Sequence, residues 1–341
     1  MSHPLRIGLI GAGRIGRIHA ETIVNRIPGA RLVSVADLHV EAAAELAAHY
    51  GVEAVHANAH AVIDDPNVDA VAICSSSDTH AAYIEAAAEA GKHIFCEKPI
   101  AIDIASIDRA LATVARCGVK LQIGFQRRFD PSFGHARRLI ASGAYGEPRV
   151  LRITSRDPGP PPIAYLAASG GIFFDMTIHD FDMARFLIGS EVVDVFAVGG
   201  VMVDPAIGEL AGDIDTAVVT LRFANGAICT IDNCRQSAYG YDQRVEWFGS
   251  KGRVAVENHT PDAVVHADAD GVHAAKPLHF FLERYMEAYR VEMEAFVEAI
   301  LNDAPVPVSG HDGRMPAVIG KAAWLSYREG RVVRIAEVDP A

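Results

Sequence analysis

The feature that most constrains this chain is a glycine loop, Gly11-x-Gly13-x-x-Gly16, which lies between a short apolar run and a helical stretch. Residues 5–10 (LRIGLI) predict a buried strand, and residues 17–26 predict the helix. In such a turn the first glycine permits a tight reversal, the second lets the backbone approach a diphosphate, and the third lets helix and strand pack closely. The start of the helix then offers free N–H groups to phosphate oxygens.

Apolar strands and helices continue to alternate as far as residue 124. Further strands are expected at 31–36, 54–55, 69–74, 93–96 and 120–124, and helices at 42–49, 59–63, 79–90 and 104–117. Such alternation implies βαβ units with right-handed crossovers and a parallel sheet. The strands are continuous apolar runs, as expected when helices cover both faces of the sheet. The pattern predicts an α/β domain with a doubly wound parallel sheet over residues 1–124.

The pattern changes over residues 125–341. Helices are expected at 131–142, 175–187, 280–301 and 315–328, and strands at 149–155, 192–198, 215–223, 227–234, 243–248 and 253–257. A proline-rich segment, 158–162, reads as a rigid loop. Several strands follow one another with turn residues between them, which is typical of antiparallel pairing. The second domain is therefore predicted to be an α/β domain on a large, mostly antiparallel sheet.

An acid, Asp37, ends the second predicted strand, where a dinucleotide-binding domain places a carboxylate for the adenosine ribose hydroxyls. Such a carboxylate repels a 2′-phosphate, and no arginine occurs among Leu38, His39 and Val40. Together with the glycine loop, Asp37 predicts NAD as the cofactor in preference to NADP. The alternative interpretation is a glycine turn that binds no ligand.

A second polar segment, Ser75-Ser76-Ser77-Asp78-Thr79-His80, follows the strand at 69–74. Ligands of open α/β sheets bind beyond the carboxyl ends of the strands, so these side chains are predicted to line the cofactor site. Alternatively, Asp78 or Thr79 only caps the helix that follows. Both interpretations are compatible, because capping and ligand contact use different atoms.

Composition excludes several classes of protein. The net charge of −12 disfavours nucleic acid and anionic membranes as partners, since both require clustered lysine and arginine. The five cysteines form no CxxC pair and predict reduced thiols in the cytoplasm. The sequence contains neither a signal-peptide pattern nor about 18 consecutive apolar residues. No HExxH or GxSxG motif occurs, and the isolated His56/His60 pair is a weak signal, so no metal is predicted.

Five segments carry a resemblance to a known family: GLIGAGRIGRIHA (8–20), VADLHVEAA (35–43), CSSSDTHAAYIEAAAEAGKHIFCEKPI (74–100), GFQRRFDPSF (124–133) and GGIFFDMTIHDFDMARFLIG (170–189). Over nearly its whole length the chain resembles the Gfo/Idh/MocA oxidoreductases, and among them the inositol 2-dehydrogenases. The resemblance implies a Rossmann domain that binds NAD, and a second domain whose open sheet face forms homo-oligomers, often tetramers. It also implies hydride exchange with a ring alcohol.

Oxidation of a secondary alcohol requires a group that takes the hydroxyl proton, and a neutral imidazole is suited to this role. Asp175 and His179 are spaced i, i+4 on a predicted helix, so they would share a face and the carboxylate could orient the ring. From spacing alone, such a pair is more often explained by helix capping beside a structural histidine. The resemblance implies that it is the catalytic D-x-x-x-H pair of the family.

Lys98, in the sequence Glu97-Lys98-Pro99, is the third predicted catalytic residue. Its ammonium group can hydrogen-bond the reacting oxygen, whereas the alternative is a surface lysine in a loop. The resemblance carries this role and implies a proline that is often cis at Pro99. In the predicted mechanism, Lys98 binds the hydroxyl, His179 removes its proton with support from Asp175, and the hydride passes to nicotinamide. Whether Lys98 or His179 is the main base is left open.

The complete predicted site has two parts. The predicted cofactor residues are Gly11, Gly13, Arg14, Ile15, Gly16, Asp37, Ser75, Ser76, Ser77, His80, Glu97, Lys98 and Gln126. The predicted substrate residues are Lys98, Arg127, Asp157, Asp175, His179, Tyr239 and Tyr241. The resemblance implies that the reaction is oxidation of myo-inositol to 2-keto-myo-inositol (scyllo-inosose) with NAD. The alternatives are a dehydrogenase for another sugar or anhydrosugar and a non-catalytic NAD-binding sensor.

Overall fold

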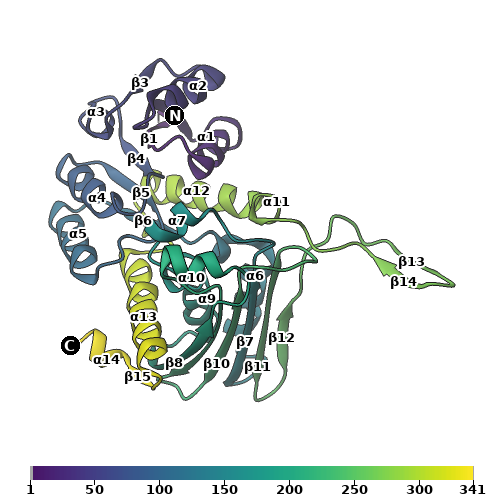
Figure 1. The fold of residues 1–341 in the computed structure, drawn as a ribbon. Helices are drawn as coiled ribbons and strands as arrows, with labels where there is room; N and C mark the ends of the chain where they lie inside the picture. Colours follow the sequence, from purple (N-terminus) through teal and green to yellow (C-terminus); the bar gives the residue numbers. More distant parts are fainter. Residues whose placement is uncertain (1–2, 341) are drawn as a thin grey trace. The chain divides into compact units, whose positions relative to one another are not determined.

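The computed structural model describes residues 3–340 of the chain. These residues form two compact units (Figure 1). The first unit contains the chain up to Phe129 together with Glu287–Ala317, and the second contains Asp130–Met286 and the chain from Val318 onward. The chain therefore passes from one unit to the other three times, and nothing in the sequence pattern indicates that the segment 287–317 returns to the first unit.

The first unit is built on a six-stranded parallel sheet with the order β3-β2-β1-β4-β5-β6. Its strands are β1 (Leu5–Ile10), β2 (Ala30–Ala36), β3 (Ala54–His56), β4 (Ala70–Ile73), β5 (His93–Glu97) and β6 (Leu121–Gly124). All neighbouring strands run parallel, which confirms the predicted doubly wound sheet. The strand order reverses between β1 and β4, and ligands of such sheets bind beyond the carboxyl ends of the strands at this position.

Helices cover this sheet. They are α1 (Arg14–Arg26), α2 (Val40–Tyr50), α3 (Ala59–Ile63), α4 (His80–Glu89), α5 (Ile104–Cys117), the short 3-10 helix η1 (Gln126–Phe129) and α12 (Met286–Leu301). The late helix α12 belongs to the core of this unit, because its buried Met293, Phe296 and Val297 pack with strand residues such as Leu9 and Phe95. Burial of these apolar side chains is what holds α12 to the sheet.

The second unit is built on a seven-stranded sheet with the order β12-β11-β7-β10-β9-β8-β15. Its strands are β7 (Pro148–Arg156), β8 (Val192–Gly200), β9 (Thr216–Phe223), β10 (Ile228–Cys234), β11 (Asp242–Gly249), β12 (Arg253–Val256) and β15 (Val333–Arg334). Only the β10–β7 pair is parallel among the paired strands of this sheet in the described chain, so the sheet is mostly antiparallel, as predicted.

Helices of the second unit include α6 (Pro131–Ala141), α7 (Ile163–Ala168), α8 (Ile172–Asp175), α9 (Ile178–Ile188), α10 (Pro205–Ala211), α11 (Phe281–Arg284) and α14 (Ile335–Val338), while α13 (Gly310–Glu329) runs from one unit into the other. Along β9, Val219 and Leu221 are buried whereas Val218 and Arg222 are exposed. This alternation shows that one face of the sheet packs on the core and the other is open in the single chain.

Two predicted helices are divided in the structure, and the helix expected over 315–328 begins earlier, because α13 starts at Gly310. The helix expected over 175–187 is divided into α8 and α9, because the chain turns at Met176 and Thr177. The helix expected over 280–301 is divided into α11 and α12 at Tyr285. Helices α7 and α10 lie in segments that the sequence pattern left as loops.

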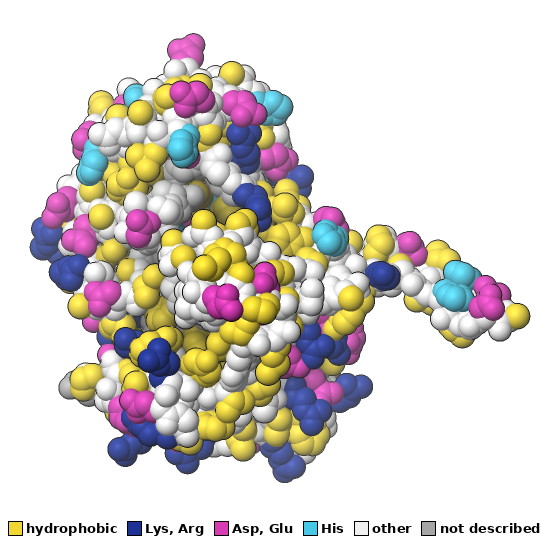
Figure 2. Space-filling model, in the orientation of Figure 1, with side chains coloured by type: hydrophobic (Ala, Val, Ile, Leu, Met, Phe, Trp, Pro, Cys, Tyr) yellow, Lys and Arg dark blue, Asp and Glu magenta, His cyan; other side chains and the backbone are white. Residues whose placement is uncertain are grey.

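A hairpin of β13 (Val265–Asp268) and β14 (Gly271–Ala274) is also absent from the predicted elements. Every residue of its two strands is exposed, and Figure 2 shows histidine and acidic side chains near its tip. In the described part of the chain, no helix has the length and apolar character required to cross a membrane.

Candidate functional site

The glycine loop connects β1 to α1 and leaves no room for side chains at its first and third glycines. Gly11 has a φ of +102°, and a Cβ built there would lie 2.5 Å from the carbonyl oxygen of Cys74. A Cβ at Gly16 would lie 1.9 Å from the carbonyl oxygen of Gly11. Gly13 differs, because no atom lies within 4 Å of the position that a Cβ would occupy there, so the second glycine faces open space. The tight turn predicted at Gly11 and the close packing predicted at Gly16 agree with this geometry, whereas the approach of a diphosphate to Gly13 stays a prediction.

The start of α1 supplies the next part of the site. The helix begins at Arg14, with Gly13 at its N-cap, and no side chain caps its first turn. The predicted residues Arg14 and Ile15 thus lie in the first turn, where backbone N–H groups have no partner within the helix. This is the part of the helix that favours an anion.

A pocket of about 300 Å³ opens beside this loop and brings together five of the predicted cofactor residues, Gly11, Gly13, Asp37, Ser75 and Ser76. It is lined by Ile10, Gly11, Gly13, Ala36, Asp37, Leu38, His39, Ala57, Ala59, Cys74, Ser75, Ser76, Thr79 and Tyr83. Asp37 accepts hydrogen bonds from the backbone N–H of Ala12 at 2.7 Å and of His39 at 2.8 Å. Its carboxylate therefore also ties the end of β2 to the glycine loop.

The serine segment forms a turn between β4 and α4. The hydroxyls of Ser75 and Thr79 lie 2.7 Å apart, and the Thr79 hydroxyl donates to the carbonyl oxygen of Ser76. Thr79 is the N-cap residue of α4 but makes no side-chain cap hydrogen bond. Ser75 and Ser76 line the pocket, whereas Ser77 is half-buried outside its lining.

Two predicted cofactor residues direct their side chains into the protein. The ring of His80 is buried, with Nδ1 2.8 Å from the carbonyl oxygen of Pro99 and Nε2 3.0 Å from that of Ser75. Glu97 Oε1 lies 2.7 Å from Nε2 of the buried His19. Sequence reasoning missed these partners, because His19 and Glu97 are 78 positions apart. The side chains of His80 and Glu97 therefore support the loops around the pocket.

Lys98 follows directly on β5, and the Lys98–Pro99 peptide bond is cis, as the resemblance implies. The lysine is half-buried. Gln126 and Arg127, just after β6, lie in η1 and are buried. Neighbouring Arg128 forms an ion pair with Asp312 at 3.0 Å, which fastens η1 to the returning segment.

In the second unit, Asp175 and His179 do not share one continuous helix, which corrects the i, i+4 argument. Asp175 is the last residue of α8, and His179 is the second residue of α9. The turn between them is fixed by Thr177, whose hydroxyl lies 2.6 Å from the Asn233 side-chain oxygen on β10. A long-range contact of this kind overrides the local helical pattern.

Asp175 has two partners that sequence reasoning missed. The Tyr165 hydroxyl donates to one carboxylate oxygen at 2.8 Å, and the Arg235 guanidinium donates to the other at 3.0 Å. Arg235 is 1 % exposed and also faces Asp213 at 3.6 Å, and burial raises the pKa of the Asp213 carboxyl. No motif marks Arg235, because its proximity to Asp175 depends on how β10 is placed in the sheet. The guanidinium therefore places a positive charge next to the Asp175 carboxylate.

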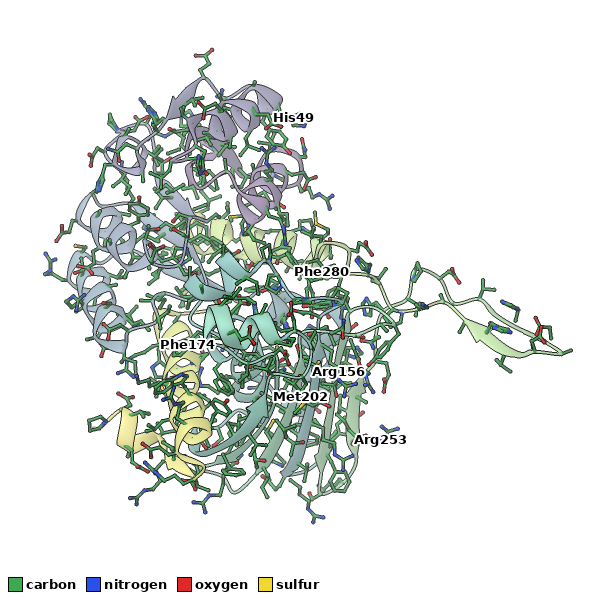
Figure 3. All side chains as sticks on the ribbon, viewed as in Figure 1. His49, Arg156, Phe174, Met202, Arg253 and Phe280 are labelled. Carbon is green, nitrogen blue, oxygen red and sulfur yellow. The ribbon has the colours of Figure 1, made fainter. Side chains whose placement is uncertain are left out.

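The predicted substrate residues Asp157, Tyr239 and Tyr241 lie at the end of the seven-stranded sheet where β7 and β10 end and β11 begins. Tyr239 donates to Asp242 at 2.5 Å and accepts from Arg156, the last residue of β7, at 3.1 Å (Figure 3 labels Arg156). The Asp157 N–H donates to the Cys234 carbonyl at 3.0 Å, which extends the pairing of β7 with β10. Tyr241 is buried, with its ring edge-on to Phe280, so its aromatic body belongs to the core.

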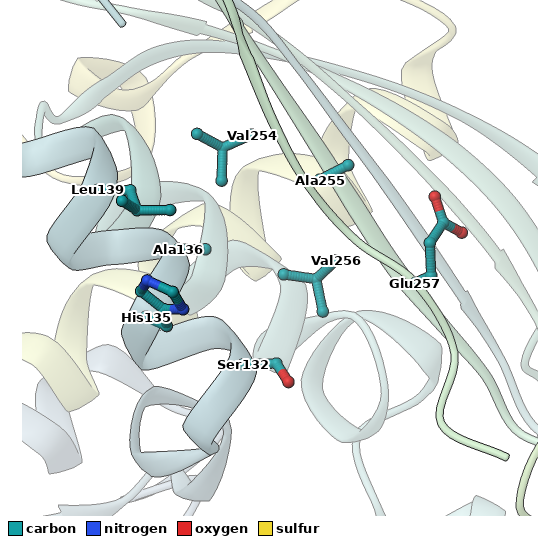
Figure 4. A pocket seen from close by; sticks show the side chains of 8 residues that line it. All are labelled: Ser132, His135, Ala136, Leu139, Val254, Ala255, Val256 and Glu257. Atoms are coloured by element: carbon teal, nitrogen blue, oxygen red, sulfur yellow. The ribbon is translucent and has the colours of Figure 1, made fainter. Parts of the chain in front are cut away.

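A further pocket, of about 260 Å³, lies between α6 and β12 and is shown in Figure 4. Its lining residues are Ser132, His135, Ala136, Leu139, Val254, Ala255, Val256 and Glu257. None of the predicted site residues lines it, and its walls are aliphatic apart from three polar side chains.

Within residues 3–340, one group of side chains has the make-up of a metal site: His19, Glu97 and Glu292, whose ligand atoms lie within 4.8 Å of one another. The three residues come from α1, β5 and α12, so no local spacing in the sequence could reveal them. The direct hydrogen-bond distance between His19 and Glu97 already satisfies one pair of these atoms.

Comparison with known protein families matches both parts of the chain. Residues 5–125 match a model described as an oxidoreductase family with an NAD-binding Rossmann fold, and residues 133–255 match the GFO/IDH/MocA C-terminal domain. The chain belongs to the GFO/IDH/MocA family. This GFO/IDH/MocA protein is therefore an NAD-dependent dehydrogenase, and the predicted cofactor and class of enzyme are confirmed.

Relatives of this GFO/IDH/MocA protein align over almost its full length. It is 48% identical to the myo-inositol 2-dehydrogenase of Thermotoga maritima, with 98% of this chain and 99% of the relative aligned. A myo-inositol dehydrogenase structure from Corynebacterium glutamicum shares 41% identity and superposes with a TM-score of 0.92, over 97% of this chain and 98% of the other. A Lactobacillus casei scyllo-inositol dehydrogenase with bound NAD(H) and scyllo-inositol shares 31% identity, with a TM-score of 0.90, over 98% and 99%.

Proposed function

We propose that this protein is an inositol 2-dehydrogenase, which oxidises the secondary alcohol of myo-inositol to 2-keto-myo-inositol with NAD. The observation that carries the proposal is the 48% identity to a myo-inositol 2-dehydrogenase over 98% of the chain. The chain also retains the three side chains that the chemistry requires, Lys98, Asp175 and His179.

The first unit is proposed to hold the dinucleotide, and its residues fit that ligand. The open space at Gly13 accommodates a diphosphate against the backbone, and the uncapped start of α1 offers N–H donors to it. Asp37 lines the same pocket and accepts hydrogen bonds from ribose hydroxyls. Bound NAD supplies the carbon that accepts the hydride.

In the proposed reaction, Lys98 donates a hydrogen bond to the substrate hydroxyl, and His179 accepts the hydroxyl proton as the C–H bond releases its hydride. The ammonium group of Lys98 stabilises the negative charge that develops on the oxygen. Asp175, held by Arg235 and Tyr165, presents a fixed carboxylate to the substrate region. Asp157, Arg127 and the Tyr239 hydroxyl are proposed to bind the remaining ring hydroxyls, while the buried Tyr241 packs against Phe280 and Tyr285.

The function is tested by following NADH absorbance with myo-inositol, scyllo-inositol, glucose and an anhydrohexitol as substrates. We expect kcat/KM to be highest for myo-inositol and the product to be the 2-ketone. Preference for an anhydrosugar or hexose would replace this proposal by the dehydrogenase alternative. NAD binding without turnover of any of these substrates would favour a non-catalytic sensor.

One specific observation favours a second candidate substrate. The Lactobacillus casei relative, which contains scyllo-inositol, superposes with a TM-score of 0.90. The two inositols differ only in the configuration of one carbinol carbon. Oxidation of either inositol at that carbon gives the same ketone, so comparing kcat/KM for the two substrates with the same enzyme preparation decides between them.

Replacing Asp37 by serine is expected to reverse the preference for NAD. Loss of the carboxylate removes charged hydrogen bonds to the ribose and should raise the KM for NAD about 10- to 100-fold. It also removes the repulsion of a 2′-phosphate, so the KM for NADP should fall. The control is Asp37→Asn, whose amide oxygen can still accept from the Ala12 N–H. An unchanged ratio of kcat/KM for the two cofactors in both variants would contradict a role of Asp37 in selectivity.

We propose further that copies of this chain associate through the open face of the seven-stranded sheet, as homotetramers in the cytoplasm. Phe196, Val218 and Phe248 are exposed on strands of that sheet, and the five cysteines are free thiols. Val218→Lys is expected to shift sedimentation from tetramer towards smaller species, because it places a charge within an apolar interface. Val265→Lys, on the exposed hairpin, is the matched control. A tetramer that persists in Val218→Lys would contradict this interface.

A further inference from the structure

Two buried histidines hold the residues on either side of Lys98. Nε2 of His19 lies 2.7 Å from Glu97 Oε1, and Nδ1 of His80 lies 2.8 Å from the carbonyl oxygen of Pro99. Lys98 is the single residue between these two anchored positions. We propose that His19 and His80 are positioning residues that fix the direction of Lys98 from both sides. The proposal deepens the proposed function, since it rests on the role of Lys98 in the dehydrogenase reaction.

The His19 anchor has little freedom to move. His19 is fully buried on α1, and its ring contacts Phe95 edge-on at 4.8 Å and Tyr289 at 5.7 Å between centroids. The Glu97 carboxyl is confined as well, because a Cβ at Gly124 would lie only 3.0 Å from its Cδ and Oε2. The hydrogen bond therefore joins two side chains whose surroundings already restrict their rotamers.

The third acidic group of this cluster comes from a distant part of the sequence. Glu292, on α12, is fully buried, and one of its oxygens lies within 4.8 Å of the His19 and Glu97 ligand atoms. Two buried carboxylates so close together repel each other unless a proton or a cation lies between them. A ring N–H of His19 that donates to Glu97 favours the arrangement in which these two side chains are hydrogen-bonded to each other.

The His80 anchor connects the lysine segment to the cofactor pocket. The same ring that reaches Pro99 places Nε2 3.0 Å from the Ser75 carbonyl, and Ser75 lines the pocket. Burial lowers the pKa of His80, with the two carbonyl oxygens acting in the opposite direction, so the neutral ring is favoured. A neutral imidazole carries one N–H, and only the tautomer with the proton on Nδ1 donates to Pro99.

The lysine side chain starts at its backbone, so a displacement of the Lys98 backbone also displaces the terminal nitrogen unless the flexible stem compensates for it. A displacement of about 1 Å at a reacting group can lower the rate about 100-fold. Anchors at both neighbours of Lys98 therefore act on kcat, whereas NAD affinity depends mainly on the glycine loop and Asp37. This separation makes the proposal measurable.

The test exchanges each histidine for asparagine and for glutamine. The asparagine amide nitrogen occupies approximately the place of Nδ1, and that of glutamine the place of Nε2. His19→Gln should therefore keep the Glu97 contact, and His19→Asn should lose it. At position 80, His80→Asn should keep the contact with the Pro99 carbonyl, and His80→Gln should lose it. We expect the poorer variant of each pair to lose about 10- to 100-fold in kcat, with the KM for NAD changed less than about threefold.

The decisive result is that glutamine is the better replacement at position 19 whereas asparagine is the better replacement at position 80, which we call the crossed order. If the histidines only filled space, the kcat of each variant would fall in parallel with its melting temperature. Losses of kcat that follow the melting temperature and show no crossed order would therefore overturn the proposal. The matched control is His93, at the start of β5, whose Nδ1 accepts from the Lys120 N–H at 3.1 Å. His93→Asn and His93→Gln are expected to leave kcat unchanged.

Three additional measurements keep the outcomes separate. Lys98→Met, assayed in parallel, tests the proposed function itself: full activity there would refute the lysine's role, whereas inactivity with uncrossed histidine variants would refute only the anchors. Gly124→Ala should displace Glu97 and lower kcat as His19→Asn does, which provides a second probe if the histidine variants fold poorly. One equivalent of tightly bound divalent metal per purified chain, lost in His19→Gln, would overturn the direct hydrogen bond in favour of a metal site.

Discussion

Replacing Lys98 by methionine is expected to lower kcat by about 1,000-fold or more while the dissociation constant for NAD changes little. Methionine retains much of the length and apolar stem of lysine but carries no charge and donates no hydrogen bond. The negative charge that develops on the substrate oxygen then loses its stabilising partner. Stopped-flow absorbance gives the rate of hydride transfer, and NAD titration by intrinsic fluorescence gives the affinity.

The control for Lys98→Met is Lys92→Met, in the same unit, whose ammonium group donates to the carbonyl oxygens of Asp65 and Val68 at 2.8 Å each. That change should affect stability but not the turnover of folded enzyme. His179→Asn should lose about 100- to 10,000-fold, as expected for removal of a general base. If Lys98→Met lost activity only in proportion to its NAD affinity, the lysine would be a cofactor residue and not a catalytic one.

Replacing Gly16 by alanine is expected to be the most damaging single change in the glycine loop. The added methyl group would lie 1.9 Å from the Gly11 carbonyl oxygen, so the backbone of β1 or α1 must move. We expect the free energy of unfolding to fall by about 3 kcal/mol or more, the upper range for overpacking. Urea denaturation followed by circular dichroism measures the change.

Gly13→Ala is the matched control, because the two substitutions add the same methyl group to one loop. The Gly13 φ is −71°, and no atom lies within 4 Å of the added methyl, so stability should be unchanged or rise by about 0.5 kcal/mol. The methyl group fills the space proposed for the diphosphate, so NAD affinity should fall. Equal stability of Gly16→Ala and the parent protein would show that the loop relaxes easily, and would remove the packing argument for the third glycine.

Local patterns predicted the first sheet well. The glycine loop, the strand that precedes it and the acid that ends β2 lie within 37 residues of sequence, and backbone sterics fix their geometry locally. Lys98 could be placed just after a strand for the same reason, because an apolar run ends at Cys96, two positions before it.

The partners of the site residues could not be predicted, because they depend on contacts between distant segments. Asp175 is held by Arg235, 60 positions later, and the chain turns between Asp175 and His179 because Thr177 contacts Asn233, 56 positions later. His19 and Glu97 meet only once α1 packs against β5. Periodicity within one helix carries no information about such pairs.

The return of α12 to the first unit constrains how this enzyme can form during synthesis. Phe296 on α12 packs against Phe95 with 5.8 Å between ring centroids, and both side chains are fully buried. A nascent chain that has emerged from the ribosome only as far as Phe129 lacks this wall of the core, so its sheet exposes apolar surface to solvent. The Rossmann unit thus matures after most of the polypeptide has been translated, and a truncated gene encoding only its N-terminal residues yields an incomplete domain.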